Sequence, residues 1–305
     1  MPTWELPSEF IEAKLFQVSR NGEAVQYEGP MIKRGDKPEA ADFAIIKAGE
    51  SLRTVVDLSG GYDMSKSGEY IVTLSSPLQH ASLSSGAMLK TANGLPMTIQ
   101  SAPLRLWVDG ADLLAKGDNQ AMGKKPPSGG GTVVNGVSYV GCTTSQINTA
   151  GNAVVEARNY SENGKGYLNT GTVGPRYTTW FGAYTSQRYS TATQHFVDID
   201  AAMDQNAGQV KINCGCNQSY YAYVYPTRPY EIFVCRAFWN APLTGTDSKA
   251  GTLIHEMSHF NAVAGTDDHV YGQAGAKNLA NTNPTAALDN ADSHEYFAEN
   301  TPFQN

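Results

Sequence analysis

The chain has 305 residues, a net charge of −7 and 41% hydrophobic residues, enough for two ordinary domains with cores of their own. The acidic balance argues against nucleic acid as a partner, and no apolar run approaches the ~18 residues that a membrane-spanning helix needs. Residues 1–6 have neither the basic nor the apolar region of a signal peptide, so we expect that a secreted form has already lost its signal.

Residues 1–123 are predicted to form β-structure. Leu52 to Leu58 alternate apolar and polar side chains, which is the period of a half-buried strand. Further apolar runs lie at 43–46, 70–74 and 104–108, and turn-forming clusters lie at 34–38, 59–61 and 66–68. Several short strands with regular turns indicate an antiparallel sandwich. This half contains no cluster of residues with catalytic chemistry.

A linker is predicted to follow this half. Residues 118–131 are rich in glycine, proline and polar side chains and lack the apolar residues needed to pack. We therefore divide the chain into a β-rich domain at 1–123, a flexible linker at 124–136 and a second domain at 137–305. Exposed linkers of this kind are where proteases cut.

The second domain is predicted to be mainly helical with a small sheet. Thr144 to Tyr160 has helical spacing, with Thr144 or Ser145 as possible caps. Another helix is expected to run from near Thr178 to around Phe196. Residues 220–225 and 231–235 read as a β-hairpin, whose edge strand could align an extended peptide by β-augmentation.

Four cysteines lie in one segment of the chain, at Cys142, Cys214, Cys216 and Cys235. An even number confined to one segment predicts two disulfides and an oxidising compartment. The Cys214-Gly215-Cys216 spacing differs from the C-x-x-C form of most zinc clips and thioredoxin sites. The cysteines alone allow three pairings.

The strongest motif of the chain is H-E-x-x-H, within Gly251 to Phe260. Residues four apart share one face of a helix, so His255 and His259 can offer two ring nitrogens to one metal ion. Glu256 can then take a proton from water bound there. Residues 246–248 supply capping oxygens for such a helix.

A third ligand is needed to complete a catalytic zinc site. The H-x-x-G-x-x-H extension is absent, which rules out the three-histidine arrangement of the metzincins. Gly265 can take the left-handed conformation that ends a helix and turns the chain back. A carboxylate just past that turn could reach the metal, and Asp267 and Asp268 are both candidates.

The segment Gly265 to Gly272, read as GTDDHVYG, resembles the G-T-x-D-x-x-Y-G signature of the aspzincins, the deuterolysin-like zinc endopeptidases. The resemblance implies that Asp268 is the third ligand of one Zn²⁺ per chain and that Tyr271 donates a hydrogen bond to the developing oxyanion. The peptidyl-Lys branch of the family is also resembled at 175–182, 223–226 and 291–297. In that branch two carboxylates bind the ammonium of a lysine that follows the cut bond, and they map to Asp292 and Glu295.

The resemblance has further implications for the whole chain. It implies the pairs Cys142–Cys214 and Cys216–Cys235, and an α+β protein with a zincin-type catalytic domain. Tyr27 to Arg34 resembles the propeptides of these enzymes, so residues 1–123 are interpreted as a pro-domain that assists folding and covers the cleft. We expect a secreted, monomeric proenzyme that acts on proteins and peptides. It would remove its own pro-domain by cutting ahead of Lys124 or Lys125, with Lys116 as a third candidate.

Alternatives remain open at this point. Glu295 could be the third ligand, as in a gluzincin, with Asp268 structural. The chain could instead be a zinc-stabilised binding protein without turnover, or an adhesion protein whose N-terminal half carries the function. We expect His195 to be structural, and His269 and His294 to support the site or lie at the surface rather than bind metal.

Overall fold

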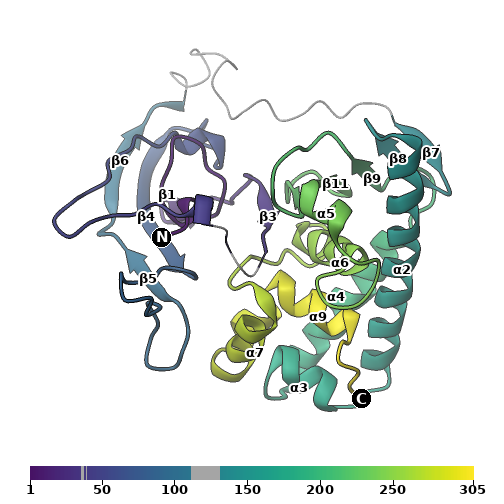
Figure 1. Ribbon diagram of the computed structural model, residues 1–305. Helices are drawn as coiled ribbons and strands as arrows, with labels where there is room; N and C mark the ends of the chain where they lie inside the picture. The colour runs from purple at the N-terminus through teal and green to yellow at the C-terminus, as the bar shows by residue number, and fades with distance from the viewer. Residues whose placement is uncertain (36–37, 39, 111–130) are drawn as a thin grey trace. The chain divides into compact units, whose positions relative to one another are not determined.

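The structure, a computed structural model, describes residues 1–35, 38, 40–110 and 131–305. The chain forms two compact units, Met1–Pro30 with Lys37–Ser128 and Met31–Asp36 with Gly129–Asn305 (Figure 1). It mixes helices and strands, as the α+β prediction expects. The short segment Met31–Asp36 belongs to the second unit, although the sequence grouped it with the N-terminal half. Lys116, Lys124 and Lys125 lie outside the described residues.

The first unit is built around one antiparallel sheet. Its central strand β4 (Gly68–Leu78) pairs with β1 (Phe16–Arg20), β5 (Met97–Gln100) and β6 (Leu104–Val108), and β1 also pairs with β2 (Glu23–Ala24). Short 3₁₀ helices lie at Thr3–Glu5, Ala40–Asp42 and Leu58–Gly60. The strands connect into a single five-stranded sheet, and the second packed sheet of a sandwich is not found in the part of this unit that the structure describes.

Two strand predictions in this unit are wrong. Residues 51–57 form no strand, and the side chains of Leu52 and Val55 are 59% and 86% exposed. In the 43–46 run, Phe43 makes only an isolated bridge to Pro2, and Ile45 is 83% exposed. Apolar alternation stabilises a strand only where a neighbouring strand and a core are available to it. The strands predicted at 70–74 and 104–108 are confirmed within β4 and β6.

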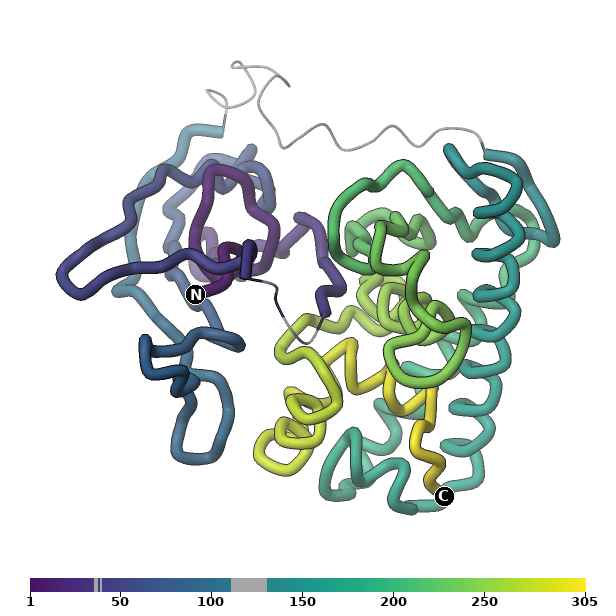
Figure 2. The backbone as a smooth tube through the Cα atoms, in the orientation of Figure 1, coloured from purple at the N-terminus to yellow at the C-terminus, as the bar shows by residue number. Residues whose placement is uncertain are grey.

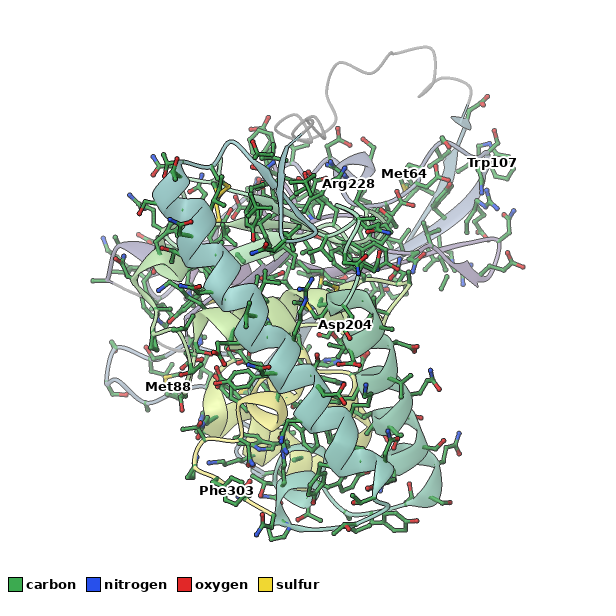
Figure 3. The ribbon with its side chains drawn as sticks, turned by 90° about the vertical axis from the view of Figure 1, so that its right-hand side faces the viewer. Met64, Met88, Trp107, Asp204, Arg228 and Phe303 are labelled. Atoms are coloured by element: carbon green, nitrogen blue, oxygen red, sulfur yellow. A yellow bond between two sulfur atoms is a disulfide. The ribbon has the colours of Figure 1, made fainter. Side chains whose placement is uncertain are left out.

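The second unit contains eight helices among its described residues. They are α2 (Thr144–Asn169), α3 (Pro175–Phe181), α4 (Ser186–Met203), α5 (Arg236–Asn240), α6 (Lys249–His259), α7 (Gly272–Thr282), α8 (Pro284–Leu288) and α9 (Ala291–Glu299). The long helix α2 crosses the side turned toward the viewer in Figure 3. Its N-cap is Thr143, which forms a capping box with Gln146, one residue before the earlier of the two caps predicted. None of the described helices is long and apolar enough to span a membrane.

The single helix predicted from Thr178 to Phe196 is in fact two, α3 and α4, separated at Gly182. This glycine has a φ of 76°, and a Cβ added to it would lie 2.1 Å from the carbonyl oxygen of Ala280. Only glycine fits a left-handed turn pressed against another backbone. The break lets α3 contact α7 and α9 while α4 packs along α2.

A six-stranded sheet completes the second unit, in the order β3-β10-β11-β9-β8-β7. The strands are β3 (Met31–Lys33), β7 (Thr132–Val134), β8 (Val137–Val140), β9 (Lys211–Asn213), β10 (Ala222–Val224) and β11 (Glu231–Val234). β10 and β11 form the predicted hairpin. Figure 2, coloured by chain order, shows the purple residues of β3 joining a unit that is otherwise teal to yellow. The disulfide Cys142–Cys214 joins the segments that follow β8 and β9, and Cys216–Cys235 joins the segment after β9 to the residue after β11. Both bonds confirm the implied pairing.

Candidate active site

Helix α6 carries the H-E-x-x-H motif through the interior of the second unit, and all of its residues are buried. Ser248 caps the helix by accepting a hydrogen bond from the Gly251 amide at 2.9 Å. The buried carboxylate of Glu299 accepts in turn from the Ser248 amide at 2.8 Å. Since α6 packs against α2 and α9, its position is set by both neighbours. The polar side chains of this helix therefore need partners inside the protein.

His255, His259 and Asp268 converge on one point. The Nε2 atoms of His255 and His259 lie 3.2 Å and 3.5 Å from Asp268 Oδ1. Gly265, with a φ of 63°, makes the turn that brings Asp268 back to the helix, and its amide donates to the Phe260 carbonyl at 3.1 Å. The structure thus brings together the two predicted histidines and, of the two candidate aspartates, Asp268.

The outer nitrogen of each imidazole faces an oxygen atom of the surrounding protein. His259 Nδ1 donates a hydrogen bond to the Thr266 carbonyl oxygen at 2.7 Å. His255 Nδ1 lies 2.8 Å from Asp292 Oδ1. With the protons on Nδ1, both Nε2 lone pairs point toward Asp268. Thr266, between the histidines and the aspartate, was missed in the sequence because its contribution is a backbone carbonyl.

These three residues fit a metal ion. Their ligand atoms all lie within 4.8 Å of one another, and His255 Nε2, His259 Nε2 and Asp268 Oδ1 are buried without a hydrogen-bond partner among the described residues. Two imidazoles and a carboxylate are a donor set that zinc prefers when it keeps one open position. Burial alone would raise the pKa of Asp268, but the two histidines hold it well below its usual range. The carboxylate is therefore ionised and ready to bind a cation.

Glu256 follows the first histidine and is fully buried. Neither of its carboxylate oxygens has a hydrogen-bond partner in the described part of the chain. Burial raises the pKa of this carboxyl to about 7, although the nearby imidazoles oppose the shift. A carboxylate with a pKa near neutrality, next to a metal site and with free oxygens, is suited to exchanging protons with water.

Helix α9 places Asp292 and Glu295 on the other side of His255. Asp292 Oδ2 accepts from the Gly272 amide at 2.6 Å, while Glu295 Oε2 lies 3.3 Å from His255 Nδ1. The two acids thus meet the Nδ1 edge of His255, and Asp268 meets the Nε2 edge. Tyr271 lies in the turn before α7, and its hydroxyl donates to the Ile32 carbonyl at 2.8 Å.

Lys33, on β3, is a charged residue of this site that sequence reasoning missed. Its ammonium lies 2.5 Å from Glu295 Oε2 and 3.7 Å from both Asp292 Oδ1 and Asp247 Oδ1. Burial alone would lower the pKa of Lys33, but the three carboxylates hold it well above its usual range. Burial alone would raise the pKa of Asp292, but Lys33 and His255 bring it below its usual range. The sequence offered one indication of its role, since Lys33 lies in the Tyr27–Arg34 stretch that resembles the propeptides of this family.

The other histidines lie away from the convergence point. His294 is buried, with Nδ1 donating to the Asn290 carbonyl at 3.0 Å and Nε2 facing His195 Nδ1 at 2.9 Å. Burial lowers the pKa of His294 to about 3. His269 Nε2 lies 2.8 Å from Asp289 Oδ2 at the surface, and these two form a partly exposed acidic group with Asp267.

Comparison with known proteins agrees with this chemistry. Residues 167–299 match the aspzincin family described as lysine-specific metallo-endopeptidase. An extracellular protease of Aeromonas hydrophila is 44% identical over 99% of this chain and 84% of its own length. A peptidyl-Lys metalloendopeptidase of Grifola frondosa is 39% identical over 86% of this chain and 70% of its own length.

One solved structure adds a comparison of folds. The zinc peptidase from Grifola frondosa is 46% identical, and the match covers 54% of this chain and all of that chain with a TM-score of 0.51. The identity and coverage of the Aeromonas protease are sufficient to assign the family. The chain therefore belongs to the aspzincins, a family of zinc metalloendopeptidases.

Proposed function

We propose that this protein is the secreted precursor of a zinc endopeptidase that cuts peptide bonds on the amino side of lysine. The observation that carries the proposal is the pair of sites on either side of His255. One side holds the converging donor atoms of His255, His259 and Asp268, and the other holds a buried ammonium between Asp292 and Glu295. A lysine bound there would place the preceding peptide bond near the donor atoms.

In this proposal, His255, His259 and Asp268 hold one zinc ion. Zinc bound there would supply Lewis-acid chemistry, polarising the carbonyl of the peptide bond and lowering the pKa of water. Glu256 would take a proton from the attacking water and deliver it to the leaving amine. Tyr271 donates a hydrogen bond to the oxygen on which negative charge develops. Asp292 and Glu295 select lysine, because its compact ammonium fits between them better than the forked guanidinium of arginine.

The geometry favours Asp268 over Glu295 as the third ligand. Asp268 Oδ1 faces the Nε2 atoms of both histidines, whereas Glu295 approaches only His255, on the Nδ1 edge, and pairs with Lys33. Membership of a peptidase family likewise favours turnover over a zinc-stabilised binding or adhesion protein. The two disulfides and the name of the Aeromonas relative support an extracellular location.

The N-terminal unit is proposed to be an inhibitory pro-domain that also assists folding. The maturing cut is proposed ahead of Lys124 or Lys125, because the peptide bonds before these lysines match the specificity proposed for the enzyme itself. Amino-terminal sequencing of the matured protein tests this assignment. A mature chain starting at neither lysine, nor at Lys116, would overturn it.

Digestion of a denatured protein mixture tests the function directly. The wild type and Glu256→Ala are compared with and without a zinc chelator, and the cut sites are identified by mass spectrometry. We expect cuts ahead of lysine from the wild type alone, abolished by the chelator. Cuts without lysine preference would retain the peptidase and reject the role of Asp292 and Glu295. No cuts from the matured wild type would reject the peptidase.

A further inference from the structure

β3 occupies an edge of the second unit's sheet in the way that a bound peptide would. It runs antiparallel to β10, with Met31 opposite Val224, Ile32 opposite Tyr223 and Lys33 opposite Ala222. The Tyr221 amide donates to the Lys33 carbonyl at 3.0 Å, which extends the ladder by one bond. Peptide substrates and inhibitors often bind by adding a strand to such an edge. Here the added strand comes from Met31–Asp36, a segment that the N-terminal unit separates from the rest of this unit, which begins at Gly129.

The side chain of Lys33 is buried among the carboxylates of Asp247, Asp292 and Glu295, a cluster called here the acidic pocket. Lys33 is 1% exposed, and its ammonium faces three carboxylates and the ring of Tyr221, whose centroid lies 5.2 Å away. A charge buried this deeply is tolerated only when it is paired. Since Glu295 and Asp292 are the groups proposed to bind the lysine of a substrate, Lys33 and a substrate lysine cannot occupy the pocket together.

The backbone on the amino side of Lys33 lies at the proposed reaction centre. In a peptide cut ahead of lysine, the reacting carbonyl belongs to the residue before that lysine, which here is Ile32. The Ile32 carbonyl is the group that accepts the hydrogen bond of the Tyr271 hydroxyl at 2.8 Å. The pocket, the strand pairing and the hydroxyl therefore agree on one register, with the Ile32–Lys33 peptide bond presented for cleavage.

We infer that Met31–Lys33 is a tethered substrate of this same active site, which blocks the entry of other lysine peptides while it remains bound. The inference rests on the proposed function for the identity of the site. Cleavage would add water across the Ile32–Lys33 bond: the hydroxyl goes to the Ile32 carbonyl carbon, a proton goes to the Lys33 nitrogen, and the C–N bond breaks. The fragment ending at Ile32 then carries a carboxylate, and Lys33 becomes a new amino terminus.

The blocking step is tested without turnover, in the full-length chain carrying Glu256→Ala. The probe is a fluorescent peptide with a single lysine, and binding is measured by fluorescence anisotropy. Lys33→Met removes the ammonium and keeps the length of the side chain. Lys47→Met is the matched control, because Lys47 also pairs with a glutamate but its side chain is 78% exposed. A probe with norleucine in place of lysine measures binding that does not use the charge.

We expect Lys33→Met to tighten binding of the lysine probe about tenfold or more, because a tethered ligand competes at an effective concentration in the millimolar range. Lys47→Met should leave the affinity unchanged, and the norleucine probe should gain little. Equal affinity in all three chains, with circular dichroism showing them folded, would overturn the blocking role. This result does not depend on whether the enzyme cuts peptides.

The register is tested in the chain without substitutions at β3, so that folding of a variant is not at issue. The zinc-loaded wild type is incubated and analysed by intact mass and amino-terminal sequencing, beside Glu256→Ala. We expect, only in the wild type, a fragment ending at Ile32 and a fragment beginning at Lys33, the latter distinct from the mature chain proposed to begin at Lys124 or Lys125. An intact Ile32–Lys33 bond in a preparation that cuts other lysine peptides would overturn the register. A preparation that cuts nothing would instead reject the proposed function, and the binding experiment would still decide the blocking role.

Discussion

Replacing Glu295 with glutamine separates recognition of lysine from the rest of catalysis. Glu295→Gln keeps the shape of the side chain and an oxygen acceptor, but it removes the charge 2.5 Å from the ammonium in the pocket. Two unit charges at this distance attract by about 7 kcal/mol at an effective dielectric constant near 20. Removing one partner of a buried pair costs about 3–5 kcal/mol in practice, since the other charge is left less well compensated.

The lower end of that range applies here. Asp292 and Asp247 remain 3.7 Å from the ammonium and still compensate its charge. A loss of about 3 kcal/mol corresponds to about a hundredfold lower kcat/KM for a lysine peptide. A peptide with norleucine in place of lysine carries no charge, so its kcat/KM should change only a few-fold. The preference for lysine over norleucine should therefore fall by more than tenfold.

The assay compares two fluorogenic peptides that differ only in lysine or norleucine. Glu162→Gln is a matched control, because Glu162 also lies 2.5 Å from a lysine, Lys165, but its side chain is 65% exposed. An exposed pair of this kind contributes about 0–1 kcal/mol, and this one should not affect specificity. An unchanged lysine-to-norleucine ratio in an active Glu295→Gln enzyme would refute the assignment of the pocket.

Three further predictions address the metal, the fold and the pH dependence of stability. Asp268→Ala should abolish stoichiometric zinc binding, whereas Glu295→Ala should retain it; atomic absorption of the dialysed proteins measures both, and the opposite pattern would support the gluzincin alternative. Gly182→Ala should destabilise the second unit by about 2 kcal/mol or more in urea unfolding, because its Cβ would meet the Ala280 carbonyl at 2.1 Å in a left-handed turn; an unchanged midpoint would contradict this. His294 has a pKa of about 3 when folded and about 6.5 when unfolded, so its contribution is complete above pH 6.5 and is lost toward pH 3. As the pH is lowered through that window, the free energy of unfolding of the wild type should fall relative to that of His294→Gln by about 1.4 kcal/mol per pH unit. A constant difference would show that His294 is not buried in its neutral form.

The sequence by itself determined the chemistry of the second unit. The spacing of His255 and His259, a turn at Gly265 and acids after it are local patterns, and helical geometry converts such spacing directly into a shared face. The helix that carries the two histidines begins at Lys249, directly after the predicted capping residues 246–248. The choice between Asp267 and Asp268 came from the family resemblance, and the structure places Asp268 Oδ1 against both imidazoles.

Local pattern was a poorer guide where the outcome depends on a distant partner. The alternation at 52–58 resembles a strand, but no neighbouring strand pairs with it among the residues that the structure describes. The residues around Thr178 to Phe196 favour one helix, yet the chain turns at Gly182, where φ is positive and the Ala280 carbonyl leaves no room for a Cβ. In both cases the outcome depends on the presence or absence of a partner far away in the sequence, and local periodicity contains no information about that partner.

Lys33 is the clearest case of what only the tertiary structure decided. Its sequence neighbours mark it as an ordinary lysine between an apolar residue and an arginine. It lies 262 residues before Glu295, and pairing of β3 with β10 is what places it among three carboxylates. Burial and charge pairing are properties of the folded interior, so the residue that fills the acidic pocket could be identified only once the strand and the helix had been brought together.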